Sequence, residues 1–204
     1  MARSPNFIFV FSDQHRYCDL GCAGNPDVIT PNMNRLAREG THFTHTISNV
    51  PLCVPARGCI MTGKHPLSHK AVSNDLPLPL SETGIAQVFK GAGYQTGYIG
   101  KWHLGGMPRD KFIAPEMRFG FDDWAGWNCH HNYFNAHYHD SDGNRIPIAG
   151  YEPDFQTDLA IQYCKAHADE PFCLYLSWGP PHNPYEQAPE QYKAMVDPGQ
   201  ITLR

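Results

Sequence analysis

Charge is scarce in this sequence, and no hydrophobic run in it is long enough to cross a membrane. Charged side chains make up 18% of the 204 residues, against roughly 25% in an average soluble domain. The formal net charge of −4 lacks the basic excess of a nucleic-acid-binding domain. The apolar run from Phe7 to Phe11 is too short for a membrane span or a secretory signal. We therefore expect no nucleic-acid or membrane partner and a cytoplasmic location.

The cysteines also lack the pattern of a zinc ribbon. There are seven of them, and the pair Cys18 and Cys22 is followed by no second pair of matching spacing. In a reducing compartment these thiols stay free. Cys59, Cys164 and Cys173 lie in apolar stretches, so we expect them to be small buried hydrophobes.

Turn-forming residues and histidines are abundant instead. The 18 glycines and 18 prolines together exceed the roughly 12% of average usage, so much of the chain is expected in tight turns and shaped loops. A chain of this length buries a core without disulfide or metal staples. The 12 histidines are the most unusual count, and several of them crowd between residues 130 and 139.

Short strands alternate with helices along the chain. The continuous apolar run at 7–11 is typical of a strand buried on both faces of a parallel sheet, and further strands are expected at 95–100 and 172–178. Three helices are expected after the N-caps Thr30, Ser81 and Asp154. This alternation predicts an α/β fold with a mostly parallel central sheet flanked by helices.

Polar side chains follow each expected strand directly. Asp13 and Gln14 follow the first strand, Lys101 and His103 the second, and His182 the third. Ligand sites of open α/β sheets lie outside the carboxyl ends of the strands. These side chains are therefore expected to converge on one rim of the sheet.

A short helix near residue 53 adds a further element to this rim. Pro55 in its first turn and Gly63 after its last turn bracket it, which puts Cys53 at its N-terminus. Free N–H groups and the positive end of the helix dipole favour an anion there. The same field lowers the pKa of a thiol, so we expect an anion site beside a reactive Cys53.

Several motifs resemble those of the type I, formylglycine-dependent sulfatases of the alkaline-phosphatase-like superfamily. Cys53-x-Pro55-x-Arg57 followed by Thr62-Gly63 resembles the family signature, although Ala56 and Met61 stand where many members carry Ser and Leu. Other matching blocks follow in the family's order, namely the first strand with Asp13-Gln14, the helix at 30–40, Gly100-Lys101-Trp102-His103-Leu104-Gly105 and Pro181-His182-Asn183-Pro184. The ordered set spans nearly the whole chain.

The resemblance implies a sulfuric ester hydrolase that acts on a small-molecule or saccharide sulfate ester. A maturation enzyme that recognises the Cys-x-Pro-x-Arg motif would convert Cys53 to formylglycine, whose hydrated aldehyde would be the nucleophile. A divalent cation, Ca²⁺ or alternatively Mg²⁺ or Mn²⁺, would bind Asp13, Gln14 and a hydroxyl of the modified Cys53.

The remaining site residues also take their roles from the resemblance. Arg57 would hold the nucleophile, and Lys101 would bridge the nucleophile and the sulfate. His103 would take a proton from the sulfated intermediate, whereas His182 would contact the sulfate and protonate the leaving oxygen.

Family members are much longer, and the resemblance puts their second pair of metal ligands and a further sulfate-binding lysine beyond residue 204. Residues 1–204 are therefore interpreted as the N-terminal part of a sulfatase catalytic domain, incomplete at its C-terminus. Within it, 119–150 breaks the α/β alternation and is expected to be a loop or hairpin insertion near the active site. Its His-rich stretch is interpreted as surface or pocket wall, with substrate contact and a transition-metal site as alternatives.

Three other functions stay open beside the sulfatase, as does a homo-oligomeric state. A phosphonate monoester hydrolase or phosphodiesterase carries the same formylglycine motif, because both substrates are tetrahedral oxyanions. An inactive fragment that lacks the later metal ligands would catalyse no reaction and would retain at most the ability to bind a ligand. A cysteine hydrolase would use the unmodified Cys53 thiolate with His103.

Overall fold

The computed structural model describes residues 4–201, so residues 1–3 and 202–204 of the interpreted domain lie outside it. Its centre is a six-stranded sheet in the order β1-β6-β2-β3-β4-β5. The first four strands of that order run parallel, and β4 and β5 pair antiparallel. The strands are β1 (Phe7–Ser12), β2 (Gln95–Lys101), β3 (Asp123–Trp127), β4 (His137–His139), β5 (Arg145–Pro147) and β6 (Phe172–Trp178). The expected α/β architecture is confirmed.

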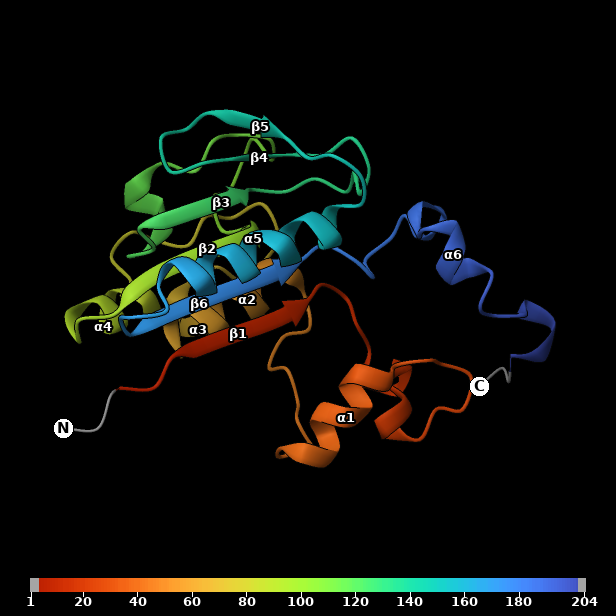
Figure 1. Ribbon diagram of the computed structural model, residues 1–204. Coiled ribbons are helices and arrows are strands. Elements are labelled where there is room, and N and C mark those ends of the chain that lie inside the picture. Colours follow the sequence, from red (N-terminus) through yellow and green to blue (C-terminus); the bar gives the residue numbers. More distant parts are fainter. Residues whose placement is uncertain (1–3, 202–204) are drawn as a thin grey trace.

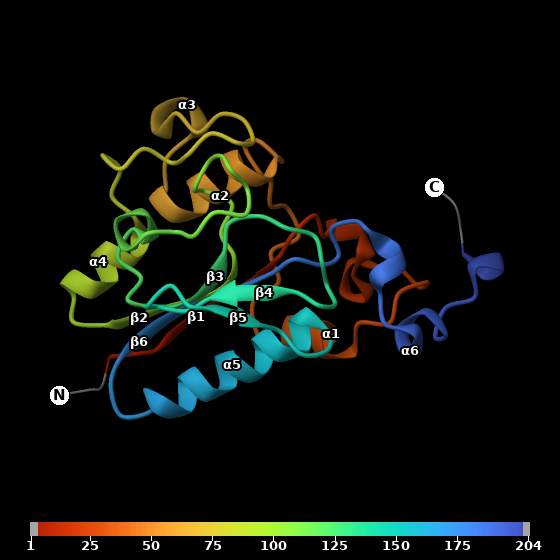
Figure 2. The same ribbon diagram turned by 90° about the horizontal axis from the view of Figure 1, so that it is seen from above.

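Helices pack on both faces of this sheet (Figures 1 and 2). The α-helices are α1 (Pro31–Glu39), α2 (Cys53–Thr62), α3 (Pro66–His69), α4 (Ile85–Gly91), α5 (Glu152–Ala166) and α6 (Glu190–Lys193). Single 3₁₀ turns are η1 (Tyr17–Asp19), η2 (Gly21–Ala23), η3 (Pro115–Arg118), η4 (Tyr185–Gln187) and η5 (Pro198–Gln200). In Figure 2 the sheet lies between α5 on one side and α2, α3 and α4 on the other. No helix within residues 4–201 is long and apolar enough to span a bilayer.

The alternation of side chains along β6 builds the two halves of the core. Leu174 and Leu176 point to the α5 side, where they pack with Ala160. Cys173 and Tyr175 point to the opposite side and join the larger cluster that reaches α2 and α4. This two-faced burial is the reason that β6 is apolar at nearly every position, as in other parallel strands between helix layers.

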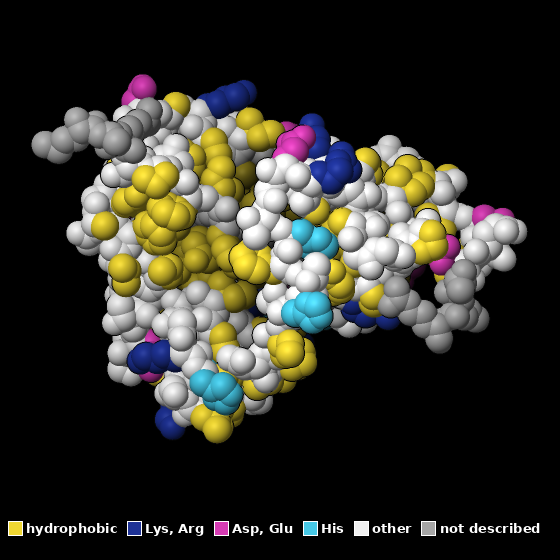
Figure 3. All heavy atoms as spheres, turned by 90° about the horizontal axis from the view of Figure 1, so that it is seen from below, with side chains coloured by type: hydrophobic (Ala, Val, Ile, Leu, Met, Phe, Trp, Pro, Cys, Tyr) yellow, Lys and Arg dark blue, Asp and Glu magenta, His cyan; other side chains and the backbone are white. Residues whose placement is uncertain are grey.

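β1 differs from the expectation of a strand buried on both faces. It forms the outer edge of the described sheet and pairs only with β6. Ile8 is 54% exposed and Val10 45% exposed, because α5 packs over β6 and β2 on their face of the sheet. On the opposite face the Phe7 ring packs against Phe89 of α4. Figure 3, which views this edge of the sheet from below, shows hydrophobic side chains gathered on the surface.

Two of the three expected helix starts are wrong. α1 begins after Thr30 as expected. Ser81 lies in a turn closed by the Glu82 N–H and the Pro79 carbonyl, so α4 starts later, where the Gln87 side chain accepts a hydrogen bond from the Gly84 N–H (2.8 Å). α5 starts earlier than Asp154, because Pro153 suits a first helical turn.

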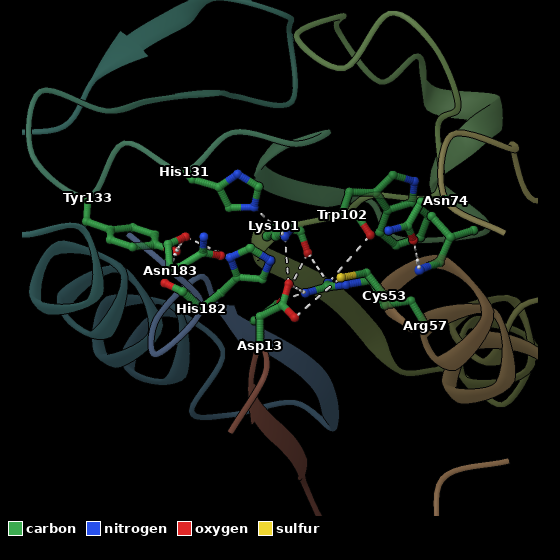
Figure 4. Close-up of polar contacts among 12 residues, drawn as sticks. Asp13, Cys53, Arg57, Asn74, Lys101, Trp102, His131, Tyr133, His182 and Asn183 are labelled. Carbon is green, nitrogen blue, oxygen red and sulfur yellow. Dashed lines mark hydrogen bonds and ion pairs between the residues drawn. The ribbon is translucent and has the colours of Figure 1, made fainter. Parts of the chain in front are cut away.

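The segment 119–150 is more ordered than a loop. Its first part contains β3, which extends the parallel sheet beside β2. Its second part is the β4–β5 hairpin, in which the Asp140 carboxylate accepts hydrogen bonds from the N–H groups of Asp142 and Asn144. Only the stretch between these two parts, around residues 128–136, approaches the rim where the polar residues converge (Figure 4).

Candidate active site

The carboxyl ends of β1, β2 and β6 meet the N-terminus of α2 at one rim of the sheet. A cavity of about 470 Å³ opens there, and its lining includes Asp13, Gln14, Cys53, Arg57 and His182. Figure 4 shows Asp13, Cys53, Arg57 and Lys101 directed toward one another from three segments, namely the end of β1, helix α2 and the end of β2. The convergence expected from the strand ends is therefore present.

Asp13 is the centre of this cluster. Its Oδ2 atom lies 2.6 Å from Lys101 Nζ and 3.2 Å from Arg57 Nη2. All three side chains are buried. Burial raises the pKa of the Asp13 carboxyl, but the charges of Arg57 and Lys101 outweigh it and hold that pKa well below its usual range. The site therefore contains two buried cations and one carboxylate.

Backbone groups of the sheet orient the Arg57 guanidinium. Nη1 donates to the Lys101 carbonyl (2.5 Å) and to Ser177 Oγ (3.0 Å), and the guanidinium carbon lies 5.2 Å from the centre of the Phe11 ring. With Nη1 held in this way, Nη2 faces Asp13 Oδ2. By the alternation along β6, Ser177 lies on the same face as Cys173 and Tyr175, the side of α2. Nothing in the sequence marks it as a site residue.

Cys53 is the first residue of α2, as expected, and is half-buried. Its Sγ lies 3.6 Å from Asp13 Oδ1. The next N–H of the helix, that of Val54, is capped by the Asn74 side chain (3.1 Å). The expected low thiol pKa is wrong, because burial and the neighbouring Asp13 carboxylate raise the pKa of Cys53 despite the two cations.

Gly100 allows β2 and β6 to approach closely just before Lys101. Its φ is +112°, and a Cβ at this position would collide with the Ser177 carbonyl oxygen. The ladder continues past β1 as well, since the Asp13 N–H donates to the Trp178 carbonyl (3.1 Å). The parallel register thus brings Asp13 and Lys101 to the same rim of the sheet, within one residue of each other along the strands.

His103 lies beside the cluster but is buried rather than on the cavity lining. Its φ of +57° is rare for a residue other than glycine, and its N–H donates to the Asn128 carbonyl (2.6 Å). Neither ring nitrogen has a hydrogen-bond partner among residues 4–201. Burial, together with the charges of Lys101 and Arg57, lowers the pKa of the ring to about 3. The imidazole is therefore neutral near pH 7, and the two neighbouring cations disfavour its protonation.

His182 reaches the opposite side of the cavity. Its Nδ1 lies 2.7 Å from the Asn183 carbonyl oxygen, which can only accept, so Nδ1 carries the proton. The ring stacks on His131, with centroids 4.2 Å apart and planes at 9°. His131 Nε2 in turn lies 3.3 Å from Lys101 Nζ. In the sequence His131 is one of several histidines in the same stretch. The path of the loop between β3 and β4 is what brings it to this rim.

The donors at this rim fit part of a site for a hard divalent cation. Asp13 offers carboxylate oxygens, and Gln14, whose φ is +59° and whose side chain carries an amide oxygen, lines the same cavity. Ca²⁺ takes six to eight oxygen ligands. Residues 4–201 contain no group of three or more His, Cys, Asp or Glu side chains arranged to hold a metal ion. Asp13 and Gln14 could supply part of such a ligand set, and the histidine-rich stretch forms no metal site within the described range.

Comparisons with known proteins agree on one family. The profile of the Sulfatase family matches residues 5–203. The ulvan-active sulfatase of Formosa agariphila is 39% identical over 202 residues, which are 98% of this chain and 40% of that protein. The N-acetylglucosamine-6-O-sulfatase of Bacteroides thetaiotaomicron is 32% identical over 191 residues, or 92% of this chain and 32% of that one.

Solved structures share the fold. A crystal structure of the sulfatase-like protein yidJ from Bacteroides fragilis superposes with a TM-score of 0.88 at 32% identity, covering 96% of this chain and 49% of that one. A phosphonate monoester hydrolase from Silicibacter pomeroyi superposes with a TM-score of 0.75 at 24% identity, over 98% of this chain and 46% of its own, which is a likeness of fold alone. The chain thus spans less than half the length of these relatives.

Proposed function

The chain belongs to the sulfatase family, and from this premise we propose that it forms the nucleophile-bearing part of a sulfuric ester hydrolase. The observation that carries the proposal is the cluster of Asp13, Arg57 and Lys101 around Cys53 at the N-terminus of α2. Two cations against one carboxylate leave the cavity with an excess of positive charge, which suits a sulfate ester.

The raised pKa of Cys53 favours a modified residue over a thiolate nucleophile. A buried thiol beside a carboxylate stays protonated at neutral pH and attacks poorly, and no described imidazole contacts its sulfur. This argues against the cysteine hydrolase. Conversion of Cys53 to formylglycine would supply a hydrated aldehyde with a hydroxyl directed at the sulfur of the ester.

The neighbouring residues divide the remaining tasks. Arg57 and Lys101 would bind the sulfate oxygens and stabilise the charge that builds up on them. His103, which is neutral near pH 7, would accept a proton near the nucleophile once a bound anion offsets the charges of Lys101 and Arg57, whereas His182 would donate one to the leaving oxygen. Asp13 and Gln14 would supply some of the ligands of a divalent cation, which we propose to be Ca²⁺. When bound, the cation would polarise a sulfate oxygen.

Relatives support a saccharide sulfate as the substrate class, since one of them is named N-acetylglucosamine-6-O-sulfatase. A phosphonate monoester or phosphodiester is the second candidate, because a phosphonate monoester hydrolase shares the fold and the same cluster fits any tetrahedral oxyanion. We retain the sulfate ester as the first choice, because the sulfatase relatives are more similar in sequence.

Two measurements test the proposal. The chain is produced together with a formylglycine-generating enzyme, and the peptide that contains Cys53 is weighed; conversion lowers its mass by about 18 Da. Turnover of an aryl sulfate is then compared with that of an aryl phosphonate and an aryl phosphodiester, with Ca²⁺ supplied. An unmodified Cys53 after coexpression contradicts the mechanism, and a preference for the phosphodiester by orders of magnitude contradicts the substrate class.

A further inference from the structure

Two stacked imidazoles, those of His131 and His182, stand across the cluster from α2, and the second of them lines the cavity. His131 comes from the loop between β3 and β4, and His182 comes from the segment after β6, yet their rings lie parallel at 4.2 Å. Figure 4 shows His131 above Lys101 and His182 beside Asp13. The pair therefore connects the cationic side of the cluster with the group proposed to protonate the leaving oxygen.

The contact between His131 and Lys101 fixes the protonation of the ring. Lys101 is an ammonium group, which donates hydrogen bonds and cannot accept them. His131 Nε2, at 3.3 Å from Lys101 Nζ, must therefore be the acceptor, and the proton of the neutral ring sits on Nδ1. Partial burial and the Lys101 charge lower the pKa of His131 to about 4, which agrees with a neutral ring at pH 7.

A neutral acceptor has a specific advantage at this position. Asp13 already accepts from Lys101, and a second carboxylate would cancel the positive excess of the cluster. An imidazole holds the ammonium in place by a hydrogen bond and leaves its charge available to an anion. The stack on His182 adds a flat surface that limits the rotation of that ring.

Further hydrogen bonds tie the two segments together. The Tyr133 hydroxyl donates to the His182 carbonyl (2.7 Å). The Gln187 side chain accepts from the Tyr133 N–H (2.7 Å) and donates to the His131 carbonyl (3.2 Å). The histidine pair is thus held by backbone contacts on both sides, independently of its own ring contacts.

We propose that His131 is a positioning residue of this site, which holds Lys101 Nζ through Nε2 and the His182 ring through stacking, so that both face a bound oxyanion. The proposal rests on the proposed function only for the identity of the anion. The tautomer and the stack are properties of the protein alone.

The first test measures the tautomer in the wild-type chain by long-range ¹H–¹⁵N correlation spectra of its histidines at pH 7. We expect His131 to show a protonated Nδ1 and an unprotonated Nε2. A protonated Nε2, whether in the neutral ring or in the imidazolium, overturns the hydrogen bond to Lys101 and with it the proposal.

The second test separates the two contacts by substitution. His131→Gln keeps a side-chain acceptor without the ring, whereas His131→Phe keeps a stacking ring without an acceptor. His139→Gln is the matched control. His139 lies in the same histidine-rich stretch, but its ring packs against Phe112 and His137, away from the cluster. Inorganic sulfate is the probe, and its affinity is measured by calorimetry.

We expect His131→Phe to weaken sulfate binding about tenfold or more, the effect of losing one hydrogen bond to a charged group. His131→Gln should recover most of that loss, and His139→Gln should bind as the wild type does. Equal binding by all the variants overturns the proposal. If the wild-type chain itself binds no sulfate, the proposed function fails, while the tautomer still decides the role of His131.

Discussion

Glu152 carries a carboxyl group that is fully buried at the first turn of α5. Burial raises its pKa to about 8. The His130 ring lies beside it, with Nδ1 3.9 Å from Oε2, but burial lowers the pKa of that ring to about 4. The imidazole is neutral near pH 7, so it offers no charge to compensate a carboxylate, and Glu152 is protonated in the folded protein.

This burial makes the stability of the fold depend on pH in a defined direction. In the unfolded chain Glu152 ionises near its ordinary pKa of 4.5, so between that value and about 8 the folded state binds one proton more. The free energy of unfolding therefore falls as the pH rises through this window, by about 1.4 kcal/mol per pH unit for one proton. Over the whole window the loss amounts to roughly 4–5 kcal/mol.

Glu152→Gln removes this titration at almost constant volume. Urea denaturation of the two proteins at several pH values between 6 and 8 gives the difference in their free energies of unfolding. As the pH rises, we expect the free energy of unfolding of the variant to increase relative to that of the wild type by about 1 kcal/mol or more for each pH unit. Glu39→Gln, the same change at an exposed position, should show a flat difference. A flat difference for Glu152→Gln as well would refute the neutral buried carboxyl.

The remaining predictions concern the cluster itself. Asp13→Asn removes the carboxylate between two buried cations, and we expect a loss of about 3–5 kcal/mol in urea denaturation; an unchanged midpoint would contradict the ion pairs. Gly100→Ala drives a Cβ into a carbonyl of β6 and should cost about 2–3 kcal/mol, whereas Gly91→Ala, which has open space, should cost little by the same assay. Cys53→Ala should abolish turnover of an aryl sulfate and Cys53→Ser should leave almost none, so full activity of the serine variant would exclude formylglycine.

The part of the site that was predictable from the sequence lies next to regular secondary structure. Asp13 and Lys101 each stand at the end of a parallel strand, and parallel strands end at a common rim. Cys53 and Arg57 are one turn apart on a helix whose start and end are marked by Pro55 and Gly63. Local patterns of this kind determine where a side chain lies, so the cluster could be expected without knowledge of the loops.

The part that was missed depends on contacts between distant segments. His131 meets Lys101 and His182 only because the loop after β3 returns to the rim, and no local pattern encodes that path. The thiol pKa was wrong for a similar reason. The helix terminus was visible in the sequence, whereas burial of Cys53 and its distance to Asp13 are tertiary properties.

The exposure of β1 is likewise a tertiary property. Its run of apolar residues is the same whether a strand lies inside a sheet or at its edge, so the sequence could not distinguish the two positions. The unbroken apolar run predicts burial on both faces, but a local pattern does not specify the neighbours of a strand.

The two buried cations of the cluster sit inside a protein whose overall charge has the opposite sign. The formal net charge is −4, while Arg57 and Lys101 face a single carboxylate. At an ionic strength of 0.15 M the field of distant surface charges fades over about 8 Å, but at low salt it extends much further. An approaching anion is then repelled at long range and attracted only once it enters the cavity. Salt should therefore speed the encounter with a polyanionic chain more than with a singly charged ester, which makes ionic strength a selector between large and small substrates.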